Sequence, residues 1–336
     1  MKPLTIRDIA QLSGCSVATV SRVMNHKPDV SAATRARVEA VLEKQQFVGN
    51  ANARGLKQAG SEAVAVILRG RGSVFLGDLA EAIISRAESS PVPWLIEYID
   101  EWGDEVSAAL RLSRERSLAG LVFVGGHLDE RSAALNALDI PMVFVTLSIE
   151  GSPLKNASSV CIDDRGMTSE AVHELLLRGC QRVAVFGGGS GGGRDSLGQR
   201  YLGVLDAHQR LGLRFDRRRY VPTRFTLEAA CAAAKKHFTA FPDTDAAFCM
   251  SDTVAIGVIR ALHDLGLRVP EDVSVIGVDG MELGQYTIPS LSTIVQPVRA
   301  LAEATVAVLR GMMEEGAPPR QITVEATLRI LESVRQ

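Results

Sequence analysis

Residues 5–25 read TIRDIAQLSGCSVATVSRVMN. Thr5 is a good helix N-cap, and the apolar residues that follow it recur at helical spacing. Gly14 lies in a short Ser-Gly-Cys turn that suits a positive φ, and Ser16 then caps a second helix. Two short helices joined by a turn of about three or four residues with glycine form a helix-turn-helix, whose second helix enters the major groove of DNA. The stretch therefore predicts a small DNA-binding head.

A third helix and the charge distribution agree with that prediction. Ser31 caps the third helix, whose inward residues are Thr34, Val38, Val41 and Leu42. Residues 1–60 carry nine basic and four acidic side chains, a net +5, although the whole chain carries −2. A basic head on an acidic body indicates that the polyanionic partner binds the head alone.

The outward face of the second helix is expected to decide which bases the head reads. Arg22 can make a bidentate contact to guanine, whereas Val17 and Ala18 offer only apolar contacts. We predict four base-contacting residues: Val17, Ala18, Ser21 and Arg22. We predict five phosphate-contacting residues, which position the head without reading sequence: Thr5, Ser16, Thr19, Asn25 and Ser31. The alternative is a solvated helix face on a small helical cap.

The head closely resembles that of LacI/GalR-family repressors. Residues 5–10 (TIRDIA), 14–25 (GCSVATVSRVMN) and 30–38 (VSAATRARV) carry the resemblance, ungapped and in register from residue 2, and it extends more loosely over the rest of the chain. It implies that the segment FVGNANARGLK is a hinge helix that becomes ordered on operator DNA, with Leu56 wedged between base pairs. The implied minor-groove residues are Asn50, Ala53 and Leu56. A plain linker is the alternative.

The body alternates apolar runs with helical stretches. One series of runs covers 63–68, 94–99, 120–124 and 142–145, and a second begins near Cys161 and continues at 183–186, 246–250 and 273–278. Continuous β-branched runs separated by helices indicate parallel sheets with helices on both faces. The predicted fold class is therefore an all-α helix-turn-helix head and hinge helix, followed by an α/β body of two doubly wound parallel-sheet lobes. The resemblance implies that the body is periplasmic-binding-protein-like.

These expectations divide the chain into three parts. Residues 1–46 are the head, 47–60 the hinge helix or linker, and 61–336 an effector-binding and dimerisation body. Within the body, the N-lobe is expected at about 61–162 and 293–322, and the C-lobe at about 163–292 and 323–336. Ligands of open α/β sheets bind beyond the strand carboxyl ends, so a ligand is expected between the lobes.

The family resemblance also implies an effector site in the body. Stretches 187–203, 250–257 and 273–294 match the family's effector domain and place Arg200, Asp252 and Asp279 at the small molecule. Arg200 would donate to ring or hydroxyl oxygens, Asp279 would accept from vicinal hydroxyls, and Asp252 would accept or brace. Gln296 is expected on the third crossover between the lobes. The implied site comprises Phe75, Thr146, Arg200, Ser251, Asp252, Asp279 and Gln296.

Two departures from the family leave the effector open. Thr146 and Ser251 stand where family members often have Asp or Asn. The loop RGRGS at 69–73 is unusually basic for a sugar pocket and would suit an acidic or phosphorylated ligand, although we favour solvated charges at a loop tip for Arg69 and Arg71. A sugar or sugar derivative is the expected effector and a nucleobase the alternative. The sequence leaves open whether the effector releases or recruits DNA.

Other function classes find little support in the sequence. The run GGGSGG at 187–192 satisfies the dinucleotide-binding pattern after a strand, with Asp216 near the distance of a ribose contact, but it lies in a glycine-rich loop where chance matches are easy. We find no phosphate-binding GK[ST], nucleophile elbow or metal cluster, and expect no catalysis, metal or cofactor. The alternatives are a cytosolic sugar-binding protein and an NAD-dependent enzyme that uses this loop.

Cellular location and assembly follow from the same sequence. The five cysteines are scattered without a CxxC pair, which is typical of reduced thiols in the cytosol. Without an apolar leader or a long uncharged apolar window, we expect a cytoplasmic bacterial protein that associates with the nucleoid when it binds DNA. A homodimer would place two heads on a pseudo-palindromic operator. Because no leucine-rich heptad tail is visible, we expect a dimer rather than a coiled-coil tetramer.

Overall fold

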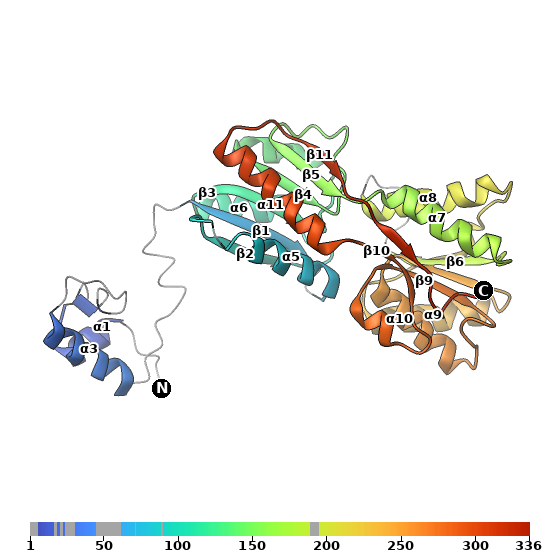
Figure 1. The fold of residues 1–336 in the computed structure, drawn as a ribbon, viewed down its shortest axis with the longest axis horizontal. Helices are drawn as coiled ribbons and strands as arrows, with labels where there is room; N and C mark the ends of the chain where they lie inside the picture. Colours follow the sequence, from blue (N-terminus) through green and yellow to red (C-terminus); the bar gives the residue numbers. More distant parts are fainter. Residues whose placement is uncertain are drawn as a thin grey trace. The chain divides into compact units, whose positions relative to one another are not determined.

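A computed structural model describes residues 6–16, 19–20, 23, 31–44, 62–70, 72–88, 90–188 and 195–336. The chain divides into two compact units, Met1–Ser61 and Glu62–Gln336. The first unit contains α1 (Ile6–Ser13) and α3 (Ala32–Lys44), drawn in blue in Figure 1. Between these helices, Gly14 has a φ of +63°, and the N–H of Thr19 donates to Ser16 Oγ over 3.1 Å. That hydrogen bond is the N-cap predicted for the second helix.

The head has a small apolar core. Four buried residues come from three helical segments: Ala10, Val20, Val23 and Val38. The third helix begins as predicted, because Ser31 Oγ accepts from the N–H of Thr34 over 3.4 Å. Local capping and a few apolar contacts therefore specify the described part of this unit.

The N-lobe of the second unit is a six-stranded sheet in the order β11-β5-β4-β3-β1-β2. All of its strand pairs are parallel. The strands are β1 (Ala63–Arg69), β2 (Trp94–Ile99), β3 (Leu118–Val124), β4 (Met142–Val145), β5 (Ala157–Cys161) and β11 (Gln321–Thr323). Helices α5 (Val74–Arg86) and α11 (Val298–Glu314) pack on one face, and α6 (Glu105–Glu115) and η1 (Glu130–Leu138) pack on the other.

The C-lobe repeats this arrangement in the order β12-β10-β9-β8-β6-β7, with β12 alone antiparallel to its neighbour. Its strands are β6 (Val183–Gly187), β7 (Tyr220–Pro222), β8 (Ala246–Cys249), β9 (Ser274–Asp279), β10 (Ser292–Val295) and β12 (Thr327–Arg329). One face is covered by α7 (Asp164–Leu177) and α8 (Ser196–Arg210), and the other by α9 (Leu227–Ala240) and α10 (Asp252–Asp264). Two short 3-10 helices, η2 (Arg217–Arg219) and η3 (Glu282–Tyr286), complete it.

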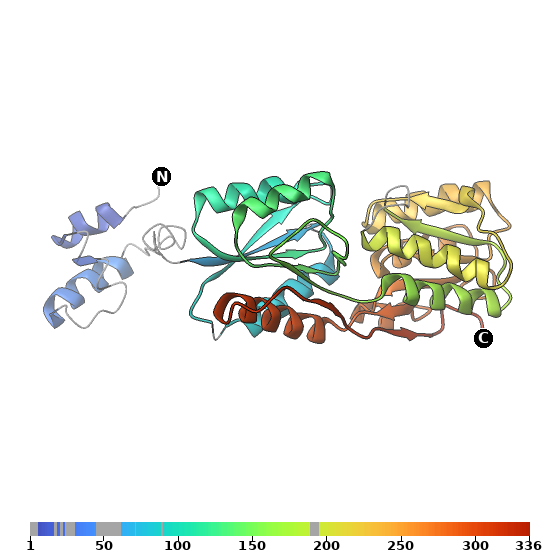
Figure 2. The same cartoon turned by 90° about the horizontal axis from the view of Figure 1, so that it is seen from above.

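Three chain crossovers join the lobes, and they correct three expectations. The run near Cys161 ends β5 of the first sheet and does not open the second series. Residues 293–295 belong to β10 of the C-lobe, so the returning N-lobe segment begins only after them. Gln296 follows β10 directly and thus lies on the second crossover in chain order, not the third. Figure 2 shows the two lobes side by side with the crossovers between them.

Several helices begin with a side-chain N-cap at the carboxyl edges of the sheets. Asp104, Asp195 and Ser251 each accept a hydrogen bond from the backbone N–H three residues later, at the starts of α6, α8 and α10. Ser73 and Thr226 do the same for α5 and α9. In a parallel α/β fold these N-termini lie where ligands bind.

Among the described residues, none of the helices is long and apolar enough to cross a membrane.

Candidate functional site

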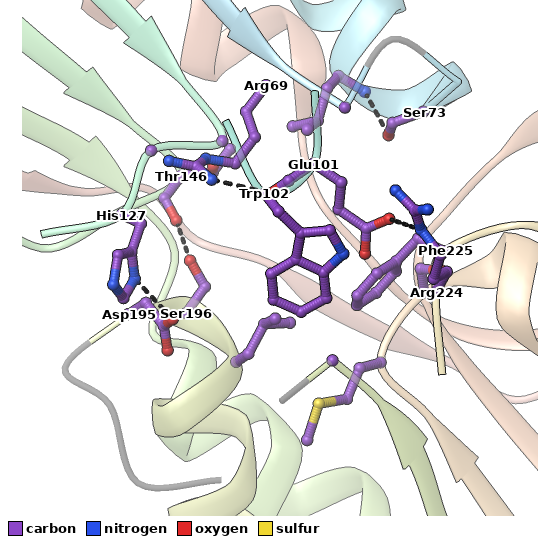
Figure 3. Close-up of a pocket in the computed structure, with 18 of the residues that line it drawn as sticks. Arg69, Ser73, Glu101, Trp102, His127, Thr146, Asp195, Ser196, Arg224 and Phe225 are labelled. Carbon is purple, nitrogen blue, oxygen red and sulfur yellow. Dashed lines mark hydrogen bonds and ion pairs between the residues drawn. The ribbon is translucent and has the colours of Figure 1, made fainter. Parts of the chain in front are cut away.

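A cavity of about 1060 Å³ lies between the two lobes. The N-lobe lines it with the segments that follow β1, β2, β3 and β4, and the C-lobe with the first turns of α8, α9 and α10 and the end of β9. Figure 3 shows side chains from both lobes directed into it. Its position at the strand carboxyl ends is that of a ligand site in open α/β sheets.

Arg200 is held inside the protein by a carboxylate and a carbonyl. Its Nε donates to Asp164 Oδ1 over 2.7 Å and its Nη1 to the carbonyl of Met250 over 2.6 Å, and only 6 % of the residue is exposed. Burial opposes the charged form, but the carboxylates of Asp164 and Asp279 raise the pKa of Arg200. These bonds use two of the five guanidinium donors, so Arg200 has further N–H groups for a ligand.

Asp279 and Gln296 form the acceptor side of the cavity. Gln296 Nε2 donates to Asp279 Oδ1 over 3.0 Å, and both residues line the cavity. Gln296 Oε1 is buried and has no hydrogen-bond partner in the described part of the chain. Burial, and next the carboxyl group of Asp252, raise the pKa of Asp279 well above its ordinary value. A buried acceptor without a partner costs free energy, so this corner favours a ligand that brings hydrogen-bond donors.

Asp252 lies behind this corner rather than at the cavity. Its Oδ1 accepts from Thr293 Oγ1 over 2.6 Å and its Oδ2 from the N–H of Met281 over 2.7 Å. Asp252 is fully buried, and burial raises its pKa to about 7. Of the two roles that the sequence left open, this geometry fits bracing of the loop after β9. The other six residues of the implied effector site line the cavity: Phe75, Thr146, Arg200, Ser251, Asp279 and Gln296.

Polar contacts join the lobes across the cavity. His127 Nδ1 in the N-lobe lies 3.0 Å from Asp195 Oδ2 in the C-lobe. Ser196 Oγ donates to the carbonyl of Thr146 over 2.5 Å, as Figure 3 shows. Arg224 of the C-lobe meets Asp100 and Glu101 of the N-lobe, each at 3.4 Å. These contacts therefore bridge the two lobes beside the cavity.

Comparison with known proteins identifies both parts of the chain. Residues 5–50 match the bacterial regulatory proteins of the lacI family, and residues 172–334 match the periplasmic binding protein-like domain. The HTH-type transcriptional regulator MalR of Clostridium butyricum is 28% identical over 328 residues, 97% of each chain. The chain belongs to the LacI family. Like the other members, it is a DNA-binding regulator of transcription.

Solved LacI-family structures share the whole fold. The transcriptional regulator CelR in its cellobiose complex superposes with a TM-score of 0.72 at 23% identity, covering 98% of this chain and 99% of that one. The lac repressor dimer bound to operator and an anti-inducer gives 0.70 at 25% identity, covering 99% of each chain. The expected fold class, a helix-turn-helix head on a body of two parallel-sheet lobes, is thus confirmed.

The DNA-contacting residues predicted from the sequence are only partly described. Ser16 and Ser31 are exposed and Thr19 is half-buried, and Ser16 Oγ lies 2.9 Å from Thr19 Oγ1. These hydroxyls mark the starts of the second and third helices of the LacI-type head. The remaining predicted DNA contacts lie outside the described residues: Thr5, Val17, Ala18, Ser21, Arg22 and Asn25, with the hinge residues Asn50, Ala53 and Leu56.

The expectation that Arg69 is a solvated charge is wrong. Arg69 ends β1, its side chain is 17 % exposed, and it forms an ion pair with the buried Glu105. Its Nη1 also donates to the carbonyl of Glu101 over 2.8 Å, and burial lowers the pKa of Arg69. Arg71 lies outside the described residues. The sequence predicts a loop from Arg69 onward, whereas strand β1 continues through Arg69 and places it at the cavity.

The glycine-rich run has a packing explanation where it is described. A Cβ at Gly187 would collide with Met250, and one at Gly188 would lie 2.7 Å from Leu197 Cδ1. Asp216, the candidate ribose contact, caps η2 and pairs with Arg218 at 2.8 Å. Residues 189–194 lie outside the described part. Within the described ranges, no group of three or more His, Cys, Asp or Glu residues is arranged to hold a metal ion.

Sequence reasoning missed several residues that line the cavity. Trp102 lies in the loop between β2 and α6, and Phe225 in the segment between β7 and α9. A signal for Trp102 was available, because the acidic run DEWGDE at 100–105 directly follows the apolar run 94–99, which predicts a strand, and so lies at its carboxyl end. No comparable signal marked Phe225, since β7 has only three residues and was not anticipated.

Proposed function

We propose that this LacI-family regulator, acting as a repressor, binds a palindromic operator as a homodimer, and that a small molecule of the carbohydrate class in the cleft controls that binding. The observation that carries the proposal is the cavity between the lobes, bridged by polar contacts from both sides. A ligand there can change the relation of the lobes, provided that it binds one arrangement better than another. CelR with cellobiose and the lac repressor on operator DNA are precedents within the shared fold.

The cavity chemistry supports a polyhydroxylated ligand. Arg200 offers donors, Asp279 and Gln296 offer acceptors, and Phe75 contributes an apolar surface. Vicinal hydroxyls both donate and accept, and sugar rings also have an apolar C–H face. We therefore assign effector contact to Phe75, Thr146, Arg200, Ser251, Asp279 and Gln296, with Asp252 as the brace of Asp279's loop.

Exposed apolar residues support a homodimer. Leu283, Tyr286 and Ile288 of the C-lobe are 54 %, 75 % and 95 % exposed, and on the N-lobe Val74 and Tyr98 are half exposed. Large apolar groups clustered at a surface mark protein interfaces. A second copy of this chain is the occupant that a two-fold operator requires. We expect a dimer in analytical ultracentrifugation, and a shift to monomer for Ile288→Asp but not for Arg260→Asp on an exposed helix face.

Operator selection tests the DNA side of the proposal. The full-length protein would select duplexes from a random pool, and fluorescence anisotropy would then compare variants. We expect palindromic sites, and a loss of about 1–3 kcal/mol with relaxed preference at one position for Arg22→Ala. Arg260→Ala, which removes an exposed body arginine, is the control. An Arg22→Ala protein that keeps its full base preference would remove Arg22 from the base contacts.

Effector control is tested on the same operator. A carbohydrate panel should contain a compound that changes operator affinity by roughly 5–150-fold, the usual range of allosteric coupling. We further propose that the protein acts in the bacterial cytoplasm, at the nucleoid when bound to DNA, and that it does not convert its ligand. Recovery of the ligand unchanged after long incubation, measured by mass spectrometry, supports that last point, and turnover or nicotinamide-cofactor binding contradicts it.

A further inference from the structure

Two aromatic side chains from opposite lobes lie at the mouth of the cleft. Trp102 lines the cavity although 63 % of it is exposed. Phe225 is half-buried and packs against the apolar clusters on both faces of the C-lobe sheet, so its ring is held in place. Figure 3 shows the indole of Trp102 with Phe225 beside it. An exposed tryptophan and a fixed aromatic ring that line the same cavity provide two flat apolar surfaces for a ligand.

An ion pair joins the chain segments that carry these two rings. Glu101 directly precedes Trp102, and Arg224 directly precedes Phe225. Arg224 Nε lies 3.4 Å from Glu101 Oε2, and Arg224 also approaches Asp100 Oδ1 at 3.4 Å. The ion pair therefore holds the segments that carry Trp102 and Phe225 next to each other. The pair itself is partly exposed, so its own free-energy contribution is small.

The described cavity lining is unsuited to an anion. Each of its arginines is already paired with a carboxylate: Arg69 with Glu105, Arg131 with Asp104 and Asp129, Arg200 with Asp164, and Arg224 with Asp100 and Glu101. Eight of the lining residues are acidic and four are arginines. Bringing a phosphate or carboxylate into this field would add like-charge repulsion.

Unpartnered buried polar atoms indicate a ligand with hydroxyl groups. Gln296 Oε1 at the base and Glu101 Oε1 at the mouth are buried acceptors without a hydrogen bond within the described ranges. Arg69 Nε is a buried donor that likewise has no hydrogen-bond partner within the described ranges. Hydroxyls satisfy acceptors and donors alike, whereas an ionised phosphate or carboxylate offers acceptors only. The volume, about 1060 Å³, is at the upper end of ordinary small-molecule sites and leaves room for more than one sugar ring.

We propose that Trp102 and Phe225 form an aromatic clamp that closes on one ring of an uncharged oligosaccharide while Arg200, Asp279 and Gln296 hold another ring deeper in the cleft. This inference rests on the carbohydrate effector of the proposed function and narrows it to neutral ligands of two or more units. In the described lining every arginine is paired with a carboxylate, so we expect sugar phosphates and sugar acids to bind more weakly than neutral sugars. Trp102 and Phe225 select for length, and the paired arginines select against charge.

The fluorescence of Trp102 can report whether a ligand is bound at the clamp. The chain has two tryptophans, and the other, Trp94, has a buried indole N–H without a partner among the described residues, so Trp94→Phe removes an unsatisfied donor. The full-length Trp94→Phe protein would be titrated with neutral di- and trisaccharides including cellobiose, maltose, lactose and trehalose, with glucose, and with glucose 6-phosphate and cellobionate. Calorimetry would measure affinity in parallel. We expect a neutral oligosaccharide to bind and to shift Trp102 emission, and the charged compounds to bind more weakly.

Variants separate the clamp from the deeper site. Trp102→Ala and Phe225→Ala should each weaken the oligosaccharide at least tenfold, with partial recovery in Trp102→Phe, and should leave the weaker affinity for its monosaccharide unit unchanged. Leu177→Ala, an exposed apolar residue at the end of α7 that lies outside both the cavity lining and the proposed dimer surface, is the control. Unchanged oligosaccharide affinity in Trp102→Ala overturns the clamp but leaves the carbohydrate effector intact. Failure of every carbohydrate to bind overturns both.

The charge selection has a test that needs no ligand. In the Trp94→Phe protein, caesium should quench Trp102 fluorescence more efficiently than iodide when each is compared with free N-acetyltryptophanamide. Glu228→Gln, which removes an exposed lining carboxylate, should raise the iodide efficiency. Equal or stronger quenching by iodide, or a sugar phosphate that binds as tightly as its neutral counterpart, would overturn the selection against anions.

Discussion

His127 and Asp195 join the two lobes of the body, with Nδ1 of the imidazole 3.0 Å from Oδ2 of the carboxylate. His127 follows β3 in the N-lobe, and Asp195 caps α8 in the C-lobe by accepting from the N–H of Gly198. Burial works against ionisation, but His127 and that N–H hold the pKa of Asp195 below its ordinary value. The contact thus ties closure of the cleft to a helix that also carries Arg200.

Removing the imidazole should loosen the closed body. We expect His127→Ala to cost about 0.5–1.5 kcal/mol of closure free energy, the usual contribution of one such hydrogen bond. Hydrogen exchange should then quicken in residues 125–129 and 195–199. Asp195→Ala is a poorer choice because it also removes the cap of α8. His263→Ala, an exposed histidine within the C-lobe, should leave exchange at both segments unchanged.

The buried pair of Arg200 and Asp164 limits how the effector site can be tested. Arg200→Ala would leave the Asp164 carboxylate buried without its cation, and breaking such a pair costs about 3–5 kcal/mol. We expect Arg200→Ala to lower the free energy of unfolding by that amount in urea, followed by tryptophan fluorescence. Arg165→Ala, which breaks an exposed pair with Asp206 on the same helix pair, should cost less than about 1 kcal/mol.

Equal destabilisation by Arg200→Ala and Arg165→Ala would mean that the buried carboxylate of Asp164 is hydrated by water or neutralised by a proton when Arg200 is absent. A lost ligand signal in Arg200→Ala is therefore ambiguous by itself. Gln296→Ala removes an atom that faces the cavity without leaving a charge unpaired, although Asp279 loses one donor. It is the sharper probe of ligand contact.

Most of the fold could be predicted from local sequence patterns. Ser16 and Ser31 were identified as N-caps, and Gly14 as a positive-φ turn, because each follows from one residue's own geometry. The apolar runs marked most of the strands because parallel strands buried on both faces are continuously apolar. The edge strand β7 and the short β11 and β12 escaped notice, since three residues carry no periodic signal.

The cavity was harder to predict because its contacts join distant segments. Arg224 and Glu101 are 123 residues apart, and nothing local to either residue indicates the other. Arg69 was assigned to solvent because its partner Glu105 is distant in sequence and no pattern links a strand end to a following helix. Asp252 and Asp279 were identified through the family resemblance. Only the structure shows that both carboxylate oxygens of Asp252 already accept hydrogen bonds, from Thr293 Oγ1 and from the N–H of Met281.

The head should unfold separately from the body. Val38 is fully buried in α3, and the head forms its own compact unit. We expect Val38→Ala to destabilise the head by about 2 kcal/mol, enough to weaken operator binding severely because so small a core has little stability in reserve. Calorimetry should show an unchanged body transition. Thr34→Ala, at a half-buried position of the same helix, should have a smaller effect on the head.

His237 should make the stability of the C-lobe depend on pH. It is buried against Phe186 and Phe241 near Arg219, with Nε2 3.1 Å from Thr244 Oγ1. Burial, and next the charge of Arg219, lower the pKa of His237 from 6.5 to about 4. Because the unfolded chain takes up the proton first, the stabilisation is complete above pH 6.5 and is lost as the pH falls toward 4.

At about 1.36 kcal/mol per pKa unit, the loss approaches roughly 3 kcal/mol. Urea unfolding at pH 7.5, 6, 5 and 4.5 would measure it as the difference between the wild type and His237→Gln, which cancels the titration of other groups. The exposed His263→Gln is the matched control and should follow the wild type. A constant difference between wild type and His237→Gln across this range would mean that His237 titrates alike in the folded and unfolded chains.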